Sequence, residues 1–240
     1  MTPKILFENK YIIAAEKPSG VLSQGAAGEC NDDDMLSIIS EYAGRPCGLL
    51  NRLDRCTGGI ILFSKDQSFT GTLSSLISDR ENCKKEYLAV VSGMPGEDEG
   101  ELFDYLLKDG KAGKSYAVKT ERKGAKKADL SYKVLAVRDG EKGVLSLVRI
   151  RLGTGRTHQI RVQFSSRSMP IAGDGKYGSR EKMRGEAKNG ISPKDMIALH
   201  AFHLTLDGGN KGSLDVYSSP YTDLYPFSIF EDVISDIIKS

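Results

Sequence analysis

The sequence has few cysteines, few histidines and no long hydrophobic run. Its four cysteines form no C-x-x-C pair, and its three histidines all lie beyond residue 150. No zinc-site spacing can be written, so we expect neither a structural metal nor a disulfide framework. No segment approaches the eighteen apolar residues of a membrane-spanning helix, and the N-terminus has no signal-peptide hydrophobic region. We expect a cytoplasmic, reduced protein with no membrane partner.

A strong net charge is also missing, because 34 Lys and Arg residues nearly cancel 32 Asp and Glu residues. The distribution of the charged residues along the chain is more informative than their sum. Acidic residues cluster at 29–34 and 97–101, and basic residues cluster at 122–127, 149–161 and 180–188. Such separation is a weak sign of a surface that faces a polyanion, and ordinary solvated loops explain it equally well.

With 39% hydrophobic and 28% charged residues in 240, the chain has the composition of a globular protein with an adequate core. Alternating apolar residues predict strands at 4–7, 11–15, 49–54, 59–65, 86–91, 115–121, 130–138 and 144–152. The dipeptide Asp139-Gly140 predicts a hairpin between the last two.

Helical spacing predicts helices at 32–42, 66–79 and 228–238, whereas residues 157–166 fit either a strand or a helix capped by Thr157. Residues 180–194 are polar and predict a surface excursion. Because strands neither alternate steadily with helices nor stand alone, the pattern favours an α+β fold. We expect one domain over residues 1–240, built from two halves with a hinge near 93–113.

Two segments carry candidate chemistry. Residues 49–62 place Asp54 between two apolar runs, although an Asp before a Thr-Gly-Gly turn is by itself most often a turn former. Residues 153–155, Gly-Thr-Gly, suggest a dinucleotide-binding loop, but His158 replaces the third glycine and no parallel βαβ unit surrounds it.

Together these segments resemble the RluA-like pseudouridine synthase family. Residues 51–59 read N-R-L-D-R-C-T-G-G, similar to the family's H-R-L-D-x-x-T-S-G signature, and residues 155–162 match its G-R-T-H-Q-I-R-V element. Further elements occur in the right order at residues 9–20, 85–93, 173–178 and 199–201. The resemblance therefore covers nearly the whole chain.

The resemblance implies a mixed, largely antiparallel sheet flanked by helices around a central RNA-binding cleft. It implies no metal and no cofactor, and it makes residues 157–166 a loop that enters a helix. Because only three residues precede Lys4, we expect no separate N-terminal RNA-binding domain of the kind that many relatives carry. A monomer is the simplest expectation for an enzyme that docks on a large RNA.

The resemblance also implies an activity, the isomerisation of uridine to pseudouridine in structured rRNA or tRNA. Asp54 is similar to the family's catalytic aspartate, Tyr87 to its active-site tyrosine, and Arg161 to the arginine that pairs with the aspartate. A carboxylate beside the anomeric carbon suits an oxocarbenium-like sugar, and a guanidinium would keep that carboxylate ionised in a water-poor pocket.

RNA contacts are expected from basic and polar residues near these segments. Arg52 would enter the stack that the flipped uridine leaves. The full set is Arg52, Arg55, Lys126, Lys127, Arg156, His158 and Gln159. The reaction needs no histidine, so His158, His200 and His203 are expected to fix loops or pack.

Asn51 and Gly58 depart from the signature, which has His and Ser there. These departures leave open a catalytically silent RNA-binding or RNA-folding factor on the same scaffold. A nucleotide-binding enzyme that uses residues 153–155 is a third hypothesis, which the incomplete glycine pattern disfavours.

Overall fold

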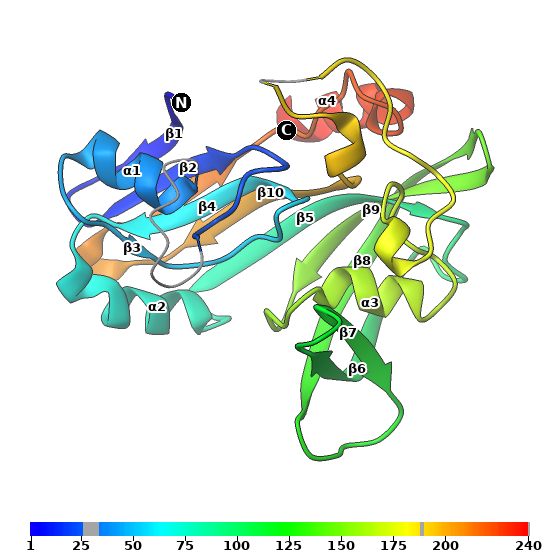
Figure 1. Ribbon diagram of the computed structural model, residues 1–240, viewed down its shortest axis with the longest axis horizontal. Coiled ribbons are helices and arrows are strands. Elements are labelled where there is room, and N and C mark those ends of the chain that lie inside the picture. The colour runs from blue at the N-terminus through cyan, green and yellow to red at the C-terminus, as the bar shows by residue number, and fades with distance from the viewer. Residues whose placement is uncertain (26–33, 188–189, 240) are drawn as a thin grey trace. The chain divides into compact units, whose positions relative to one another are not determined.

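The structure is a computed structural model that describes residues 1–25, 34–187 and 190–239 (Figure 1). The chain divides into two compact units. Unit 1 comprises Met1–Lys85 and His200–Pro220, and unit 2 comprises Glu86–Leu199 and Tyr221–Ser240. The predicted acidic cluster at 29–34 lies outside the described residues except for Asp34, as does Lys188 of the third basic cluster.

Unit 1 is built on a mixed sheet. β2 pairs antiparallel with both β1 and β4, β4 runs parallel to β10, and β10 pairs antiparallel with β11. β4 is buried along its whole length, which agrees with its continuous apolar run. The strands are β1 (Lys4–Glu8), β2 (Ile12–Lys17), β3 (Gly48–Leu49), β4 (Gly58–Ser64), β10 (Leu199–Leu206) and β11 (Leu214–Tyr217).

Two helices pack in unit 1 where helical spacing predicts them. α1 (Met35–Ala43) begins at Asp34, whose side chain accepts a hydrogen bond from the Ser37 N–H, and ends at Gly44 in the left-handed region. α2 (Thr70–Ser78) follows a short 3₁₀ turn and buries Leu73 and Ile77. Residues 32 and 33 of the first predicted helix lie outside the described residues.

Unit 2 is built on an antiparallel sheet with the strand order β5-β9-β8-β6-β7. α3 (Gln159–Ser165) crosses this sheet near β6 and β7 (Figure 1). α4 (Glu231–Lys239) closes the chain as predicted. The strands are β5 (Cys83–Ser92), β6 (Glu99–Asp109), β7 (Lys114–Val118), β8 (Ala125–Gly140) and β9 (Gly143–Leu152).

The fold class is the predicted one, a mixed and largely antiparallel sheet with helices around it. β6 is a strand that the sequence did not predict, because both of its faces carry apolar residues and an acidic run precedes it. β6 also lies inside the segment 93–113, and the chain passes between the two units within β5 instead. A hinge near 93–113 stays a prediction.

The strand predicted at 49–54 is wrong beyond Leu49, because side chains there take the place of a backbone ladder. The Ser23 hydroxyl donates to the Leu53 carbonyl oxygen at 2.8 Å and accepts from the Leu53 N–H at 3.0 Å. Asn51 Oδ1 likewise accepts from the N–H of Leu62 on β4 at 2.7 Å. The segment that carries Asp54 is therefore an ordered loop.

Two smaller predictions also need correction. The hairpin between β8 and β9 turns at Glu141 and Lys142, two residues later than predicted, because Gly140 and Gly143 form its closing pair. The N-cap position of α3 is His158, which has a φ of 55° and makes no side-chain capping bond, and it is not Thr157. The Thr157 carbonyl oxygen instead accepts a hydrogen bond from the Ser115 hydroxyl at 2.9 Å.

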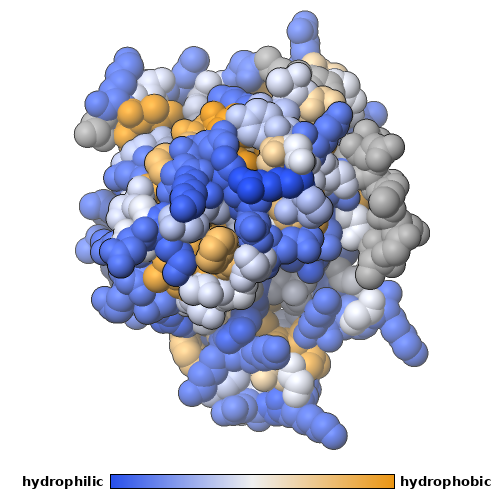
Figure 2. All heavy atoms as spheres, turned by 90° about the vertical axis from the view of Figure 1, so that its left-hand side faces the viewer, coloured by the Kyte–Doolittle hydropathy of each residue, from blue (hydrophilic) through white to orange (hydrophobic). Residues whose placement is uncertain are grey.

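The face of the molecule drawn in Figure 2 is mainly hydrophilic, with only small apolar patches between polar side chains. The apolar residues of unit 1 gather instead in a core between its sheet and its helices. This core includes Ile12, Ile60, Leu62, Leu73, Ile77 and Leu204. It supports β2 and β4, the two strands from which the Asp54 loop is held.

Candidate active site

Asp54 lies in the loop between β3 and β4 and is half-buried. The loop is tied to β4 at its first residues, because the Leu50 N–H donates to the Leu62 carbonyl oxygen at 2.9 Å and Asn51 bonds the Leu62 N–H. A tight turn follows, in which the Thr57 N–H donates to the Asp54 carbonyl oxygen at 3.0 Å. The carboxylate is thus presented from a loop fixed at both ends.

Lys17 at the end of β2 is fully buried beneath this loop, with 0% of its surface exposed. Burial of the ammonium lowers the pKa of Lys17 to about 7, and the neighbouring Cys56 and Asp54 offset part of that shift. Its Nζ donates hydrogen bonds to three main-chain carbonyl oxygens, those of Pro18 (2.9 Å), Val21 (2.7 Å) and Arg55 (3.2 Å). Sequence analysis assigned no role to Lys17.

A second pair of bonds joins the turn after β2 to the Asp54 loop. The Gly20 N–H donates to the Arg55 carbonyl oxygen at 2.7 Å, and Arg55 Nε donates back to the Gly20 carbonyl oxygen at 2.8 Å. Arg52 and Arg55 are both exposed on either side of Asp54. These two arginines are therefore available on the surface of the loop for contacts with a ligand.

Arg161 lies on α3 in unit 2 and is buried, with 5% of its surface exposed. It forms a bidentate ion pair with Asp174, in which Nε lies 2.6 Å from Oδ2 and Nη2 lies 2.9 Å from Oδ1. The Asp174 side chain is completely inaccessible to solvent. The family motif at residues 173–178 contains Asp174, but the sequence gives no sign that Asp174 is the partner of Arg161.

Tyr87 lies on β5 in the same unit as Arg161. It pairs with Ile150 on β9, and 8% of its surface is exposed. Asp54 belongs to the other unit, so the expected pairing of Asp54 with Arg161 would join the two units. That pairing stays a prediction.

The RNA-contact residues predicted in unit 2 fall into exposed and enclosed positions. Lys126 and Lys127 on β8 are exposed, as is Arg156 in the loop before α3. Arg156 Nε donates to the Lys127 carbonyl oxygen at 3.0 Å, which ties the loop to the strand. Arg156 is therefore a near neighbour of the Lys127 main chain, whereas the Lys126 and Lys127 side chains, as consecutive residues of a strand, point to opposite faces of β8.

Gln159 and His158 take part in the protein's own bonding. Gln159 is 3% exposed, and its amide accepts from the Thr154 hydroxyl at 2.7 Å and donates to the Asp129 carbonyl oxygen at 2.9 Å. His158 Nδ1 lies 2.8 Å from the Tyr177 hydroxyl oxygen. Both residues thus fix the loop before α3, and the RNA contacts expected of them stay predictions.

His200 and His203 have packing and hydrogen-bonding positions, as sequence analysis expected. Burial lowers the pKa of His200 to about 4, and its Nε2 lies 2.8 Å from the Ser218 hydroxyl oxygen. His203 stacks on Tyr217 with the ring centroids 4.0 Å apart and pairs with Asp215. Among the residues that the structure describes, no three His, Cys, Asp or Glu side chains gather in a metal-binding arrangement.

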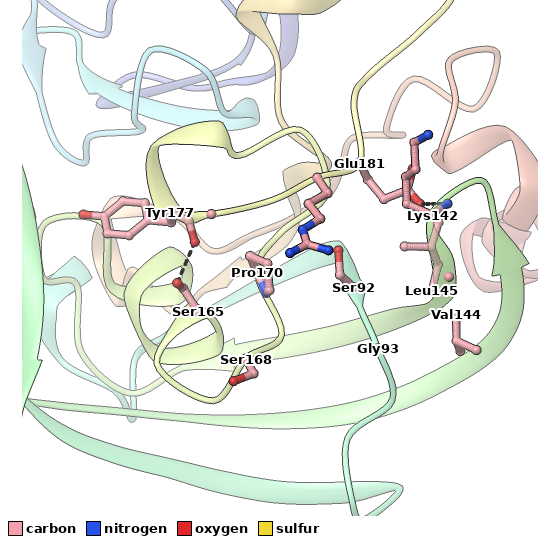
Figure 3. A pocket seen from close by; sticks show the side chains of 13 residues that line it. Ser92, Gly93, Lys142, Val144, Leu145, Ser165, Ser168, Pro170, Tyr177 and Glu181 are labelled. Atoms are coloured by element: carbon pink, nitrogen blue, oxygen red, sulfur yellow. Dashed lines mark hydrogen bonds between the residues drawn. The ribbon is translucent and has the colours of Figure 1, made fainter.

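A pocket of about 470 Å³ lies in unit 2 beside Ser92 (Figure 3). The Ser92 hydroxyl is buried and makes no hydrogen bond with any described residue. Ser92 is five residues along β5 from Tyr87, a separation of roughly 17 Å in an extended strand. None of the residues predicted for the active site lines this pocket, so we do not count it as part of the candidate active site.

No helix in the described part of the chain has the length and the apolar character needed to cross a membrane. A family model described as RNA pseudouridylate synthase matches residues 11–166. This match includes the Asp54 loop, Tyr87 and Arg161.

Curated relatives resemble the chain over most of its length. Ribosomal large subunit pseudouridine synthase D of Borreliella burgdorferi is 29% identical over 227 residues, which are 90% of this chain and 64% of that protein. Ribosomal large subunit pseudouridine synthase C of Escherichia coli O157:H7 is 31% identical over 222 residues, which are 91% of this chain and 66% of that protein. The chain thus spans slightly less than two thirds of these relatives.

Solved structures share the fold. Human RNA Pseudouridylate Synthase Domain Containing 1 aligns with a TM-score of 0.71 and 20% identity, covering 92% of this chain and 84% of its own. Human RNA Pseudouridylate Synthase Domain Containing 4 aligns with a TM-score of 0.70 and 22% identity, covering 97% and 93%. With the family model matched over residues 11–166, the chain belongs to the RNA pseudouridylate synthase family.

Proposed function

We propose that this protein isomerises uridine to pseudouridine in structured RNA, with Asp54 as the catalytic carboxylate. The observation that carries the proposal is the family match over residues 11–166, because this segment contains Asp54, Tyr87 and Arg161 in the family's own motifs. The loop that holds Asp54 through Lys17 and Asn51 supports it.

The reaction conserves all atoms. The C1′–N1 glycosidic bond breaks, the uracil turns, C1′ bonds to C5, and the proton on C5 leaves while N1 gains one. The sugar becomes electron-poor during this exchange, so a carboxylate next to C1′ can stabilise the charge or form a covalent bond. Asp54 takes that role in the proposal, and the departing uracil carries negative charge on its oxygens.

Arg161 and Tyr87 complete the proposed site. Arg161 supplies a positive charge that favours the ionised form of Asp54, and Tyr87 offers a ring for stacking on uracil with a hydroxyl for removal of the C5 proton. Because a stacked uridine hides C1′ and C5, the target must leave the helix, and Arg52 would fill its place.

We further propose rRNA of the large ribosomal subunit as the substrate, because the two curated relatives are named for that subunit. The chain spans 64% and 66% of those relatives, so the substrate is proposed for the catalytic part that the chain represents. A cytoplasmic location and a monomeric state complete the proposal.

The silent RNA-binding alternative rests on Asn51 and Gly58, and both residues fit their positions. Asn51 Oδ1 accepts a hydrogen bond from the Leu62 N–H, so it supports the Asp54 loop. A Cβ atom at Gly58 would come within 3.0 Å of Ser19 Oγ and 3.1 Å of His200 Nδ1, so a glycine suits the space there. These contacts favour an active enzyme in which Asn51 and Gly58 support the Asp54 loop in place of the His and Ser of the family signature.

The test uses transcripts labelled with tritium at C5 of uridine, because pseudouridine formation releases that hydrogen to water. The chain should release tritium from a large-subunit rRNA transcript, and Asp54→Asn should reduce the rate by about 10³-fold or more while RNA affinity is retained. Release from tRNA alone would change the substrate class. No release from either RNA, or substantial turnover by Asp54→Asn, would contradict the proposal.

A further inference from the structure

Asp174 is held in a turn that depends on its neighbours. Gly173 has a φ of 86°, and a Cβ atom there would come within 2.9 Å of Met183 and 3.1 Å of the Met196 carbonyl oxygen. The Asp174 N–H donates to the Ile171 carbonyl oxygen at 3.0 Å. Only glycine satisfies both the backbone conformation and the space before Asp174, so this turn requires a glycine at position 173.

The ion pair between Asp174 and Arg161 is both buried and bidentate. Two parallel N–H···O contacts fix the plane of the guanidinium as well as its position. They use Nε and one hydrogen of Nη2, whereas a guanidinium has five N–H donors. Asp174 therefore fixes the orientation of the whole guanidinium through bonds to one of its edges.

Tyr177, three residues after Asp174, supports Arg161 through its ring. The Arg161 Cζ lies 5.0 Å from the ring centroid, within the range of a cation–π contact. The ring is itself fixed, because the Tyr177 hydroxyl accepts from the Ser115 N–H at 2.9 Å. Figure 3 shows the Tyr177 main chain held by the Ser165 hydroxyl, which donates to the Tyr177 carbonyl oxygen at 2.7 Å.

From this geometry we infer that Asp174 is a positioning residue for the isomerisation, which holds the Arg161 guanidinium in one orientation against the Tyr177 ring. The inference rests on the proposed function, since it assigns the use of Arg161 to that reaction. A guanidinium held on one edge and over one face has little freedom to turn. The charge of Arg161 then has its orientation before the reaction begins, which avoids reorganisation during the reaction.

A purely structural ion pair would have different consequences. Loss of such a pair lowers stability and the fraction of folded enzyme, but it leaves the rate constant of each folded molecule unchanged. Loss of a positioning carboxylate lowers the rate constant itself, because a displacement of about 1 Å in a catalytic group can cost about 100-fold. RNA affinity depends mainly on phosphate contacts, so it should stay unchanged when the rate constant falls.

The experiment compares Asp174→Asn with Asp104→Asn in the full chain. Asp104 is a matched control, because it also pairs with an arginine near α3, with Arg167 Nη1 at 2.8 Å, and it also bonds the α3 residue Gln163. Single-turnover tritium release, RNA affinity by filter binding and thermal unfolding are measured for each. Asp174→Asn should lower the rate constant by about 100-fold with RNA affinity within about threefold, whereas Asp104→Asn keeps the wild-type rate constant.

A double-mutant cycle tests the link to Arg161. Asp174→Asn should have much less effect on the rate constant in an Arg161→Lys background, with a coupling of about tenfold or more, and Asp104→Asn should show no coupling. Should Asp174→Asn fail to fold, Asp174→Glu keeps the charge and moves the carboxylate by one methylene. It should then fold and still lose rate.

The outcomes separate this inference from the proposed function. If wild type releases tritium and Asp54→Asn does not, the function stands. In that case a wild-type rate constant in folded Asp174→Asn or Asp174→Glu, or additive effects with Arg161→Lys, would overturn the positioning role alone. If wild type releases no tritium from any RNA tested, the proposed function fails first.

Discussion

The Lys17 ammonium donates a hydrogen bond to the carbonyl oxygen of Arg55, the residue directly after Asp54, at 3.2 Å. Lys17 ends β2, so this bond joins a largely buried strand of the unit 1 sheet to the loop that presents Asp54. The same Nζ also satisfies two carbonyl oxygens of the turn that follows β2. One buried cation thus orders two loops.

Lys17→Met should lower the free energy of unfolding by about 2 kcal/mol near neutral pH, because it leaves three carbonyl oxygens without a donor. The loss should grow with pH. The Lys17 pKa is about 7 in the folded protein, against the ordinary lysine value of 10.5 in the unfolded chain. Between these values the unfolded chain binds more protons, so the contribution of Lys17 to stability rises with pH.

Urea unfolding of wild type and Lys17→Met between pH 6.5 and 9.5 tests this expectation. The difference in unfolding free energy should widen toward high pH. The exposed Lys108→Met serves as the charge-loss control and should give a small, constant difference. A constant difference for Lys17→Met as well would contradict the lowered pKa.

Arg161→Ala should reduce both stability and activity. It leaves the Asp174 carboxylate buried without its partner, which typically costs about 3–5 kcal/mol. Arg167→Ala is the control, because its ion pair with Asp104 is partly exposed and should contribute about 1 kcal/mol or less. Equal unfolding midpoints of the two variants in urea would show that burial does not make the Arg161 pair special.

The regular spacing of apolar residues in the sequence made most of the fold predictable. The alternation in β8 and β9 and the helical spacing in α1 and α4 each depend on neighbours in sequence, so the sequence alone was sufficient. The end of the strand predicted at 49–54 was not predictable, because Ser23 lies thirty residues before Leu53, the residue it bonds. Spacing rules carry no information on such long-range side-chain bonds.

The candidate site also contains residues that the sequence predicts and one residue, Asp174, whose pairing with Arg161 only the structure shows. Asp54, Tyr87 and Arg161 are predicted from motifs, which record residue types and order. Asp174 lies thirteen residues after Arg161, and no periodicity connects the two. The sequence does place the acid Asp174 directly after Gly173, and this was the one available signal of a fixed carboxylate. That Gly173 leaves no space for a Cβ atom becomes visible only in the packing around it.

Gly58→Ser would restore the family signature but should destabilise this protein by about 1–2 kcal/mol, because overpacking displaces its neighbours. A Cβ atom there would approach Ser19 Oγ to 3.0 Å and His200 Nδ1 to 3.1 Å, and both residues are almost completely buried. Gly71→Ala in α2 is the control, since no atom lies within 4 Å of its Cβ position. Thermal unfolding should show a lower Tm for Gly58→Ser only. An unchanged Tm would mean that Ser19 and His200 move aside easily.

Neutralising Lys126 and Lys127 should weaken RNA binding and reduce its dependence on salt. Both side chains are exposed on β8, and the exposed Arg156 lies nearby, because its Nε bonds the Lys127 carbonyl oxygen. Each lost phosphate contact should lower the slope of log affinity against log salt by about one. Filter binding of an rRNA fragment at several salt concentrations measures that slope.

The control for this variant is the double change Lys10→Gln with Lys239→Gln, which removes the same charge from other exposed positions. A general loss of positive charge would flatten the slope equally in both double variants. A local contact flattens it only for Lys126 and Lys127, because released counterions are counted at the phosphates that the protein touches. Equal slopes in the two double variants would contradict an RNA contact at Lys126 and Lys127 and would show that this part of β8 is ordinary solvated surface.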